Sequence, residues 1–140
     1  MGSLVFVDTS ALVGKFLEAD ERHDRALQAL RRLLRDGREL LTSDYVFDEV
    51  VTLVRGRADH GSAVKAGEGI LGSQVLDLVE VDGELRKDAW RLFRKYRDQV
   101  LSFTDCTSFA VMEKYGIREA FTFDEDFSKV GFEVVPRRKR

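Results

Sequence analysis

Short segments rich in apolar and β-branched residues alternate along the chain with amphipathic helical segments, and this alternation restricts the fold. The apolar segments predict strands near residues 4–7, 39–42, 75–81, 120–123 and 132–135. The spacing of apolar residues between them predicts helices near residues 9–17, 23–36, 43–56, 60–72, 85–98 and 104–116. Strands separated by helices pair in parallel. We therefore predict an α/β fold with a parallel sheet of about five short strands and helices on both faces.

The helix near residues 85–98 is the most strongly charged of these segments. Its apolar residues recur at helical spacing and predict one buried side, opposite a solvated face. The residues that we assign to the buried side are Leu85, Trp90, Leu92, Phe93 and Tyr96.

Length and composition indicate one domain with a hydrophobic core. The chain has 140 residues, of which 44% are hydrophobic. The single proline, Pro136, comes just before four basic residues, so we predict one domain over residues 1–136 and a basic tail over residues 137–140. No apolar run approaches the ~18 residues of a membrane span, and the N-terminus lacks a secretory signal pattern. We expect a cytoplasmic protein without a membrane partner.

The charge balance separates an acidic body from the basic tail. The 23 basic and 25 acidic residues give a net charge of −2. Without the four basic residues of the tail, 19 basic residues remain against 25 acidic residues, a net charge of −6. One cysteine and two histidines are too few for a thiolate or imidazole metal centre, so a bound metal requires oxygen ligands.

Four carboxylates occupy positions that a parallel sheet brings to one edge. Asp8 follows the first predicted strand, and Asp124 follows the fourth. Asp105 lies at the start of a helix, and Glu49 lies one turn into another helix beside its apolar stripe. Ligand sites in such sheets lie beyond the carboxyl ends of the strands. The sequence therefore predicts an acidic pocket at that edge.

Each carboxylate alone also has a structural interpretation. Asp8 and Asp105 suit helix N-caps, Asp124 suits a turn, and Glu49 suits the exposed edge of its helix. Together, without an equal set of nearby cations, they would repel one another. A bound Mg²⁺ or Mn²⁺ explains such an oxygen-rich pocket.

The segments that contain these acids resemble one known family. They read VFVDTSAL at residues 5–12, SDYVFDEVV at 43–51, FTDCTSFAVM at 103–112 and FTFDEDF at 121–127. Their order and spacing resemble those of the PIN domain, and in length the chain resembles the VapC-type toxins of toxin-antitoxin pairs. This resemblance implies an α/β/α sandwich and a metal-dependent endoribonuclease that hydrolyses RNA phosphodiester bonds.

The resemblance also implies a catalytic quartet that holds one or two Mg²⁺ or Mn²⁺ ions. The quartet corresponds to Asp8, Glu49, Asp105 and Asp124. Asp126 is the alternative occupant of the fourth position, and Asp48 is the alternative to Glu49. We assign the three aspartates of the quartet as the nearest ligands, and Glu49 to binding through water or to orienting the attacking water.

Candidate RNA contacts flank the acids. Hydroxyl groups beside them in the family correspond to Thr9, Ser10 and Thr104, which also suit helix caps. Cationic candidates for phosphate contacts are Lys15, Arg55, Arg57 and the tail at residues 137–140, although each also suits ordinary solvated charge.

The resemblance implies two protein partners and leaves two rival functions. An antitoxin would block the acidic pocket with a basic or apolar segment, and a second copy would form a homodimer. One rival is a PIN scaffold that binds RNA or protein without catalysis. The other is an aspartyl-phosphate phosphotransfer domain, although Ser10 stands where the haloacid-dehalogenase type has its second acid. A phospho-receiver would need a late lysine that the segment Thr122 to Asp124 does not supply.

Overall fold

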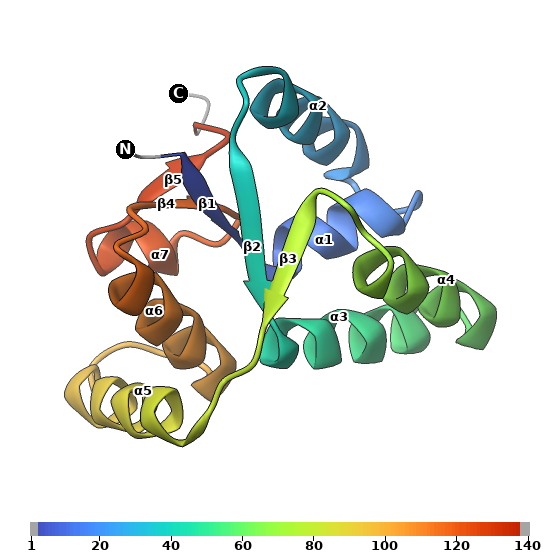
Figure 1. Cartoon of the computed structure of the whole chain (residues 1–140). Coiled ribbons are helices and arrows are strands. Elements are labelled where there is room, and N and C mark those ends of the chain that lie inside the picture. The colour runs from blue at the N-terminus through green and yellow to red at the C-terminus, as the bar shows by residue number, and fades with distance from the viewer. Residues whose placement is uncertain (1–2, 138–140) are drawn as a thin grey trace.

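The computed structural model describes residues 3–137 and contains one parallel sheet. The strands are β1 (Leu4–Val7), β2 (Glu39–Ser43), β3 (Leu76–Val79), β4 (Glu119–Phe121) and β5 (Glu133–Val135). They pair in parallel in the order β3-β2-β1-β4-β5 (Figure 1). The predicted α/β class with a five-stranded parallel sheet is confirmed.

Seven helices within the described residues connect these strands and cover the sheet. They are α1 (Thr9–Phe16), α2 (His23–Arg35), α3 (Asp44–Arg57), α4 (His60–Leu71), α5 (Gly83–Lys95), α6 (Phe103–Tyr115) and α7 (Asp126–Lys129). In Figure 1, α1, α2 and α4 lie on one side of the sheet, and α6 and α7 lie on the other. Each pair of neighbouring strands is connected through at least one helix, as parallel pairing requires.

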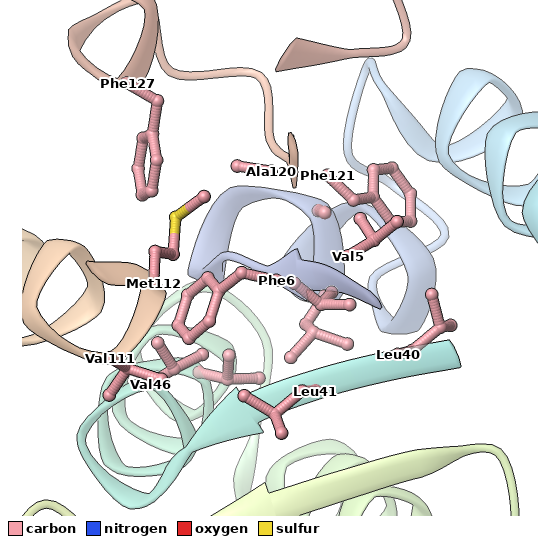
Figure 2. Close-up of a cluster of buried hydrophobic side chains, with 14 of the residues drawn as sticks. Val5, Phe6, Leu40, Leu41, Val46, Val111, Met112, Ala120, Phe121 and Phe127 are labelled. Atoms are coloured by element: carbon pink, nitrogen blue, oxygen red, sulfur yellow. The ribbon is translucent and has the colours of Figure 1, made fainter. Parts of the chain in front are cut away.

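The central strand β1 is buried on both faces. Val5 and Phe6 have no exposed surface, which explains why this strand is continuously apolar instead of alternating. Figure 2 shows Phe6 together with Val111 and Met112 of α6 in the apolar core. Packing of the helices on β1 fixes the position of the residue that follows it, Asp8.

The pairing of β1 with β4 determines which residues meet at the edge of the sheet. Val7 is paired with Phe121, and the Asp8 N–H donates to the Phe121 carbonyl oxygen at 3.0 Å. On the other side of β1, the buried Thr42 hydroxyl donates to the Val7 carbonyl oxygen at 2.7 Å. The carboxyl end of β1 is therefore held from both sides.

Several boundaries differ from those predicted. The third strand is shorter than residues 75–81, and α7, which was not predicted, follows β4. Helix α6 begins at Phe103, not at residue 104, because Ser102 caps it: the Asp105 N–H donates to the Ser102 hydroxyl at 3.0 Å. Asp105 is therefore the third residue of the helix and not its N-cap.

The prediction for the buried side of α5 was wrong at two aromatic residues. Leu85 and Leu92 are buried as expected. Trp90 is 55% exposed and Phe93 is 39% exposed. Phe103 of α6 contacts both rings, with 6.3 Å between its centroid and that of Trp90 and 6.2 Å to that of Phe93, but it leaves much of their surface exposed. An apolar stripe in the sequence does not reveal how much of it the neighbouring element covers.

Two predictions from the sequence concern the basic tail and the absence of a membrane span. Arg137 is exposed, and the rest of the predicted tail, residues 138–140, lies outside the described part of the chain. The division into a domain at residues 1–136 and a tail therefore stays a prediction. No helix within residues 3–137 is both long and apolar enough to cross a membrane.

We predict that Phe127→Ala destabilises the fold by about 3–5 kcal/mol, because truncation of a fully buried ring leaves a cavity. The Phe127 ring packs edge-on against Phe109 of α6 at 5.0 Å between centroids, so it anchors α7. Tyr115→Ala, at a ring that is 42% exposed, should cost less than about 1 kcal/mol. Urea denaturation of both variants measures the difference. Equal losses would contradict this account of α7.

Candidate functional site

Acidic side chains from four parts of the chain gather at the carboxyl edge of the sheet. Asp8 directly follows β1, and Asp124 lies three residues after β4. Asp105 lies in the first turn of α6, and Glu49 lies in the second turn of α3. Both helices begin at this edge, so the fold brings together the four carboxylates that the sequence singled out.

Asp8 is the most enclosed of these acids and is 4% exposed. Its Oδ2 atom accepts hydrogen bonds from the hydroxyl groups of Thr122, at 2.7 Å, and Ser10, at 3.2 Å. Thr122 lies beside Asp8 because the β1–β4 register pairs the residues just before them. Although Asp8 occupies the N-cap position of α1, its side chain makes no capping hydrogen bond. Its contacts therefore favour a role at the edge of the sheet over the capping interpretation.

Burial raises the pKa of Asp8 from its ordinary value of 3.8 to about 7. The hydrogen bond from Thr122 acts in the opposite direction, whereas the negative charges of Asp105 and Asp124 raise the pKa further. The ionised form of Asp8 is thus less favourable than that of an ordinary aspartate, and a nearby positive charge would favour it.

Asp105 is held by the capping box of α6. Its Oδ2 atom accepts a hydrogen bond from the Ser102 N–H at 3.1 Å. Partial burial raises the pKa of Asp105 to about 6, and the charges of Asp124 and Glu49 add to that effect.

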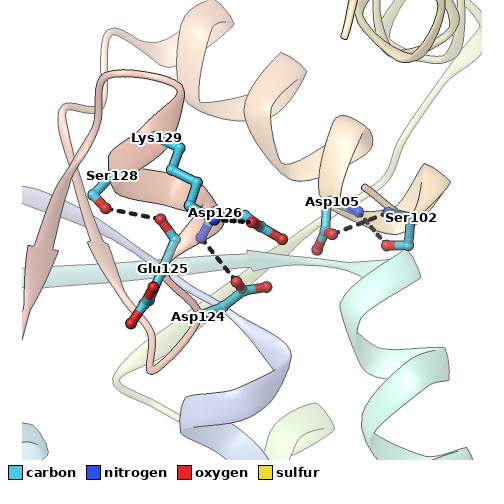
Figure 3. A network of polar contacts seen from close by, with 7 residues as sticks. All are labelled: Ser102, Asp105, Asp124, Glu125, Asp126, Ser128 and Lys129. Atoms are coloured by element: carbon cyan, nitrogen blue, oxygen red, sulfur yellow. Dashed lines mark hydrogen bonds and ion pairs between the residues drawn. The ribbon is translucent and has the colours of Figure 1, made fainter. Parts of the chain in front are cut away.

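The turn after β4 presents Asp124 and Asp126 to the same space. The Asp124 N–H donates to the Thr122 hydroxyl at 3.0 Å, and the Asp126 N–H donates to Asp124 Oδ1 at 2.9 Å. Figure 3 shows Asp124 and Asp126 on this turn, with Asp105 facing them from the start of α6. Burial is the main cause that raises the pKa of Asp124.

Three of these carboxylates are close enough to share a cation. One oxygen from each of Asp105, Asp124 and Asp126 lies within 4.8 Å of the other two. The ammonium group of Lys129 is 3.7 Å from Asp126 and is largely exposed. Carboxylate oxygens are the ligands that Mg²⁺ and Mn²⁺ prefer. The hydroxyl group of Thr9, which follows Asp8, is buried and has no hydrogen-bond partner among the described residues. The donor set fits a hard divalent cation.

The alternative acids differ in position. Asp126, the sequence's second choice for the fourth position, lies within the three-carboxylate cluster together with Asp124. Glu49 is half-buried, whereas its alternative, Asp48, is exposed. This arrangement supports Glu49 over Asp48 and adds Asp126 to the candidate ligands.

Of the hydroxyl candidates Thr9, Ser10 and Thr104, Ser10 has structural contacts through its hydroxyl group. Ser10 donates to Asp8 and accepts a hydrogen bond from the Phe123 N–H at 2.8 Å, so it links α1 to the turn after β4. The Thr104 carbonyl oxygen accepts from the Thr107 hydroxyl at 2.6 Å within α6. Their proposed contact with RNA stays a prediction.

The three cationic candidates lie away from the first turns that carry the acids. Lys15 is in the last turn of α1, with its ammonium group 4.0 Å from the centre of the Phe16 ring, and burial lowers its pKa. Arg55 and Arg57 are in the last turn of α3, and Arg57 is 3.7 Å from Asp20. Their RNA contacts also stay predictions.

The sequence analysis did not identify Thr122 and Ser102 as residues of the site. Both are positioning residues, since Thr122 bonds Asp8 and Ser102 bonds Asp105. A helix-capping pattern, serine three residues before an acid, was available in the sequence for Ser102. Thr122 could be found only from the strand register.

Comparison with known families identifies this arrangement. Residues 5–133 match the PIN domain. The chain belongs to the PIN domain family. The resemblance stated from the four acidic segments is confirmed, and PIN nucleases are metal-dependent, in agreement with the carboxylate cluster.

Two curated relatives define the type of PIN protein. The chain is 38% identical over 135 residues to the 23S rRNA-specific endonuclease VapC20 of Mycobacterium tuberculosis, covering 95% of this chain and 99% of that protein. It is 26% identical over 151 aligned positions to ribonuclease VapC6 of Methanocaldococcus jannaschii, covering 93% and 94% of the two chains. This PIN domain protein is a VapC-type toxin endoribonuclease. The predicted enzyme class is confirmed over the phosphotransfer and non-catalytic alternatives.

Solved structures agree with this assignment. The crystal structure of Mycobacterium tuberculosis VapC20, described as a toxin that cleaves the sarcin–ricin loop, has a TM-score of 0.82 at 37% identity and covers 91% of this chain and 95% of that one. VapBC2 of Rickettsia felis, bound to promoter DNA, has a TM-score of 0.67 at 10% identity, with coverages of 94% and 96%. A toxin-antitoxin complex of Klebsiella pneumoniae has a TM-score of 0.66 at 16% identity, with coverages of 96% and 99%. The last two show the shared fold alone.

We predict that the metal-free protein loses stability as the pH rises from about 4 to about 7. The folded-state pKa of Asp8 lies above its ordinary value, so the folded protein binds more protons than the unfolded chain across this window. Asp105 contributes in the same direction. Asp8→Asn should flatten this dependence and be more stable than wild type at pH 8 by on the order of 1 kcal/mol.

Thermal melts in EDTA at pH 5 and pH 8 measure this effect. Asp48→Asn, at an exposed acid, is the control and should melt like wild type at both values. Added Mn²⁺ should reverse the order, because it stabilises wild type more than Asp8→Asn. An Asp8→Asn variant that melts far below wild type in EDTA at pH 8 would show that Asp8 has a structural role.

Proposed function

We propose that this VapC-type enzyme hydrolyses phosphodiester bonds in the sarcin–ricin loop of 23S rRNA with the help of Mg²⁺ or Mn²⁺. The observation that carries the proposal is the convergence of Asp105, Asp124 and Asp126 within 4.8 Å, beside the buried Asp8. Action on ribosomal RNA requires access to ribosomes, so we also propose a cytoplasmic location.

Four aspartates would hold one or two ions. Asp105, Asp124 and Asp126 supply adjacent oxygens, and Asp8 adds a buried carboxylate whose ionised form a nearby positive charge would favour. When bound, such an ion offsets the negative charge that develops on the phosphate and lowers the pKa of a coordinated water.

The chain's own residues orient the reacting groups. Glu49 is half-buried on α3, in the second turn from the edge of the sheet that carries the acids, and we assign it to accepting a hydrogen bond from the attacking water. Thr122 and Ser102 restrict the rotation of Asp8 and Asp105 through hydrogen bonds of 2.7 and 3.1 Å. These contacts would keep the carboxylates oriented before the substrate arrives.

The substrate proposal is supported by the relationship to VapC20, whose name and structure title specify 23S rRNA and the sarcin–ricin loop. The 38% identity extends over 95% of this chain and 99% of VapC20, so it includes every acidic segment.

We predict that Asp105→Asn and Asp124→Asn each lower the cleavage rate at least about a hundredfold, because each removes a charged ligand. Both substitutions keep an oxygen that accepts the local backbone hydrogen bond. The assay follows cleavage of an RNA hairpin carrying the sarcin–ricin loop in Mg²⁺, Mn²⁺ or EDTA. Asp48→Asn on α3 should cleave like wild type.

Each component of the proposal fails separately in this assay. Full cleavage in EDTA would contradict the metal requirement. Full activity of both asparagine variants would contradict the assignment of Asp105 and Asp124 as ligands. Cleavage of total cellular RNA without cleavage of the hairpin would leave a nuclease with another target.

We also propose that an antitoxin and a second copy of this chain bind the enzyme. Structural neighbours occur in a toxin-antitoxin complex and in VapBC2, which supports an antitoxin for this fold. A basic antitoxin segment would pair with the carboxylates of Asp105 and Asp124, which would otherwise hold the ion.

We predict that co-expression with the product of the adjacent upstream gene yields a complex that does not cleave the hairpin. Mutation of that partner's basic residues should restore cleavage, since the charge-assisted pairs would be lost.

Light scattering of the free enzyme at micromolar concentration should give the mass of a homodimer. Unchanged cleavage in the complex, or a monomer mass, would contradict the respective proposal.

A further inference from the structure

Helix α5 carries a set of cationic residues around an exposed tryptophan. The two rows at i, i+4, i+8 spacing are Arg86, Trp90 and Arg94, and Lys87, Arg91 and Lys95. Residues four apart lie on the same face of a helix, so each row extends about 12 Å along α5. One row thus places an aromatic ring between two cations.

These two rows and Phe103 line an open pocket with a volume of about 850 Å³, which we call the α5 groove. The indole of Trp90 is 55% exposed, so one face of it remains available to a ligand. Its ring stacks on Phe93, with 5.6 Å between centroids and 16° between planes, and lies 6.3 Å from the Phe103 ring. The protein therefore fixes the orientation of an aromatic surface that it does not cover.

The cations of the groove are mostly free for a ligand. Within residues 3–137, Arg86, Lys87 and Arg94 form no ion pair with a carboxylate. Arg91 lies 3.7 Å from Glu113, but both side chains are at least half exposed, so this pair is weak. Such a local positive charge contrasts with the net charge of −2 for the whole chain.

The groove lies next to the acidic cluster. Phe103 is the first residue of α6, and Asp105 follows two residues later. The Phe103 ring also packs edge-on against Tyr45 of α3 at 6.0 Å, and α3 carries Glu49. A chain of aromatic contacts therefore connects the groove to the helix starts that hold two of the acids.

We propose that the α5 groove binds unpaired nucleotides of the RNA substrate next to the cleaved bond. One base stacks on Trp90, and the cations of the two rows contact the adjacent phosphates. Base stacking on an aromatic ring suits the splayed bases of an RNA loop. This inference rests on the proposed function, because it names where that substrate is held.

Charge complementarity favours RNA over a second copy of the chain. If the two-fold axis of a dimer passed through this face, the five cations of one copy would lie near the five cations of the other, and like charges would repel. RNA supplies a phosphate for each cation and a base for the ring.

Trp90 is the only tryptophan in the chain, so its fluorescence reports on the groove directly. Titration of wild type in EDTA with the sarcin–ricin hairpin should quench this fluorescence with the same midpoint as binding measured by filter retention. A binding curve without quenching would overturn the assignment of Trp90.

Substitutions divide the groove into its stacking and charged parts. Trp90→Ala should raise the Kd of the hairpin about tenfold, and Trp90→Phe, which keeps a ring, should stay within about threefold. Arg86→Glu combined with Arg94→Glu should raise the Kd and the KM at least tenfold. Loss of two phosphate contacts should flatten the slope of log Kd against log salt by about 1.4.

The matched control reverses two charges elsewhere. Arg31 and Arg35 are exposed on the last turns of α2, which leads to the opposite end of the sheet at the start of β2. Arg31→Glu combined with Arg35→Glu changes the net charge equally and should leave the Kd within about threefold. Thermal melts establish that every variant is folded, and the kcat of the groove variants at saturating RNA should stay within about twofold.

The outcomes separate this inference from the proposed function. Suppose that wild type cleaves the hairpin. If the groove variants then bind the hairpin like wild type, or if the α2 control loses as much affinity as they do, only the proposal for the α5 groove is overturned. Groove variants that become monomeric in light scattering would make this face an interface between copies. Quenching by the antitoxin but not by RNA would assign the groove to the antitoxin. Hairpin binding and quenching without cleavage in Mn²⁺ would retain the groove and reject the proposed substrate.

Discussion

The parallel pairing of β1 with β4 is the constraint on which the site depends. It joins residues more than a hundred positions apart in the sequence and places Thr122 beside Asp8, where the hydroxyl donates to the carboxylate at 2.7 Å. The same register directs the turn after β4, with Asp124 and Asp126, toward the start of α6. If this pairing shifted by one residue, the side chains that follow β4 would exchange faces, and the cluster would not form.

The folded chain holds acids together despite their repulsion. Asp8 and Asp105 have raised pKa values because burial and neighbouring carboxylates disfavour their charged forms. The buried β1 strand, the capping box of Ser102 and the anchoring of α7 by Phe127 keep the acids in place. Such a preorganised, anionic arrangement favours binding of a divalent cation, which would offset the repulsion.

The surface carries two neighbouring regions of opposite charge, the acidic cluster and the cationic α5 groove. The acidic cluster at the end of the sheet suits cations and would repel RNA phosphates by itself. The cationic face of α5 lies next to it and supplies the attraction that an acidic centre lacks. A net charge of −2 hides this division, because the segregation lies in the distribution of charges and not in their sum.

The sequence by itself determined the alternation of strands and helices, the parallel sheet and the four acids of the family pattern, because these are local periodicities or short motifs. Only the tertiary structure decided that Asp126 joins Asp105 and Asp124, that Thr122 holds Asp8, and that Trp90 remains exposed. Strand register and the extent to which one helix covers another arise from contacts between distant segments. A pattern read along the chain identifies which residues are apolar or acidic, but the packing of distant elements decides which of them meet.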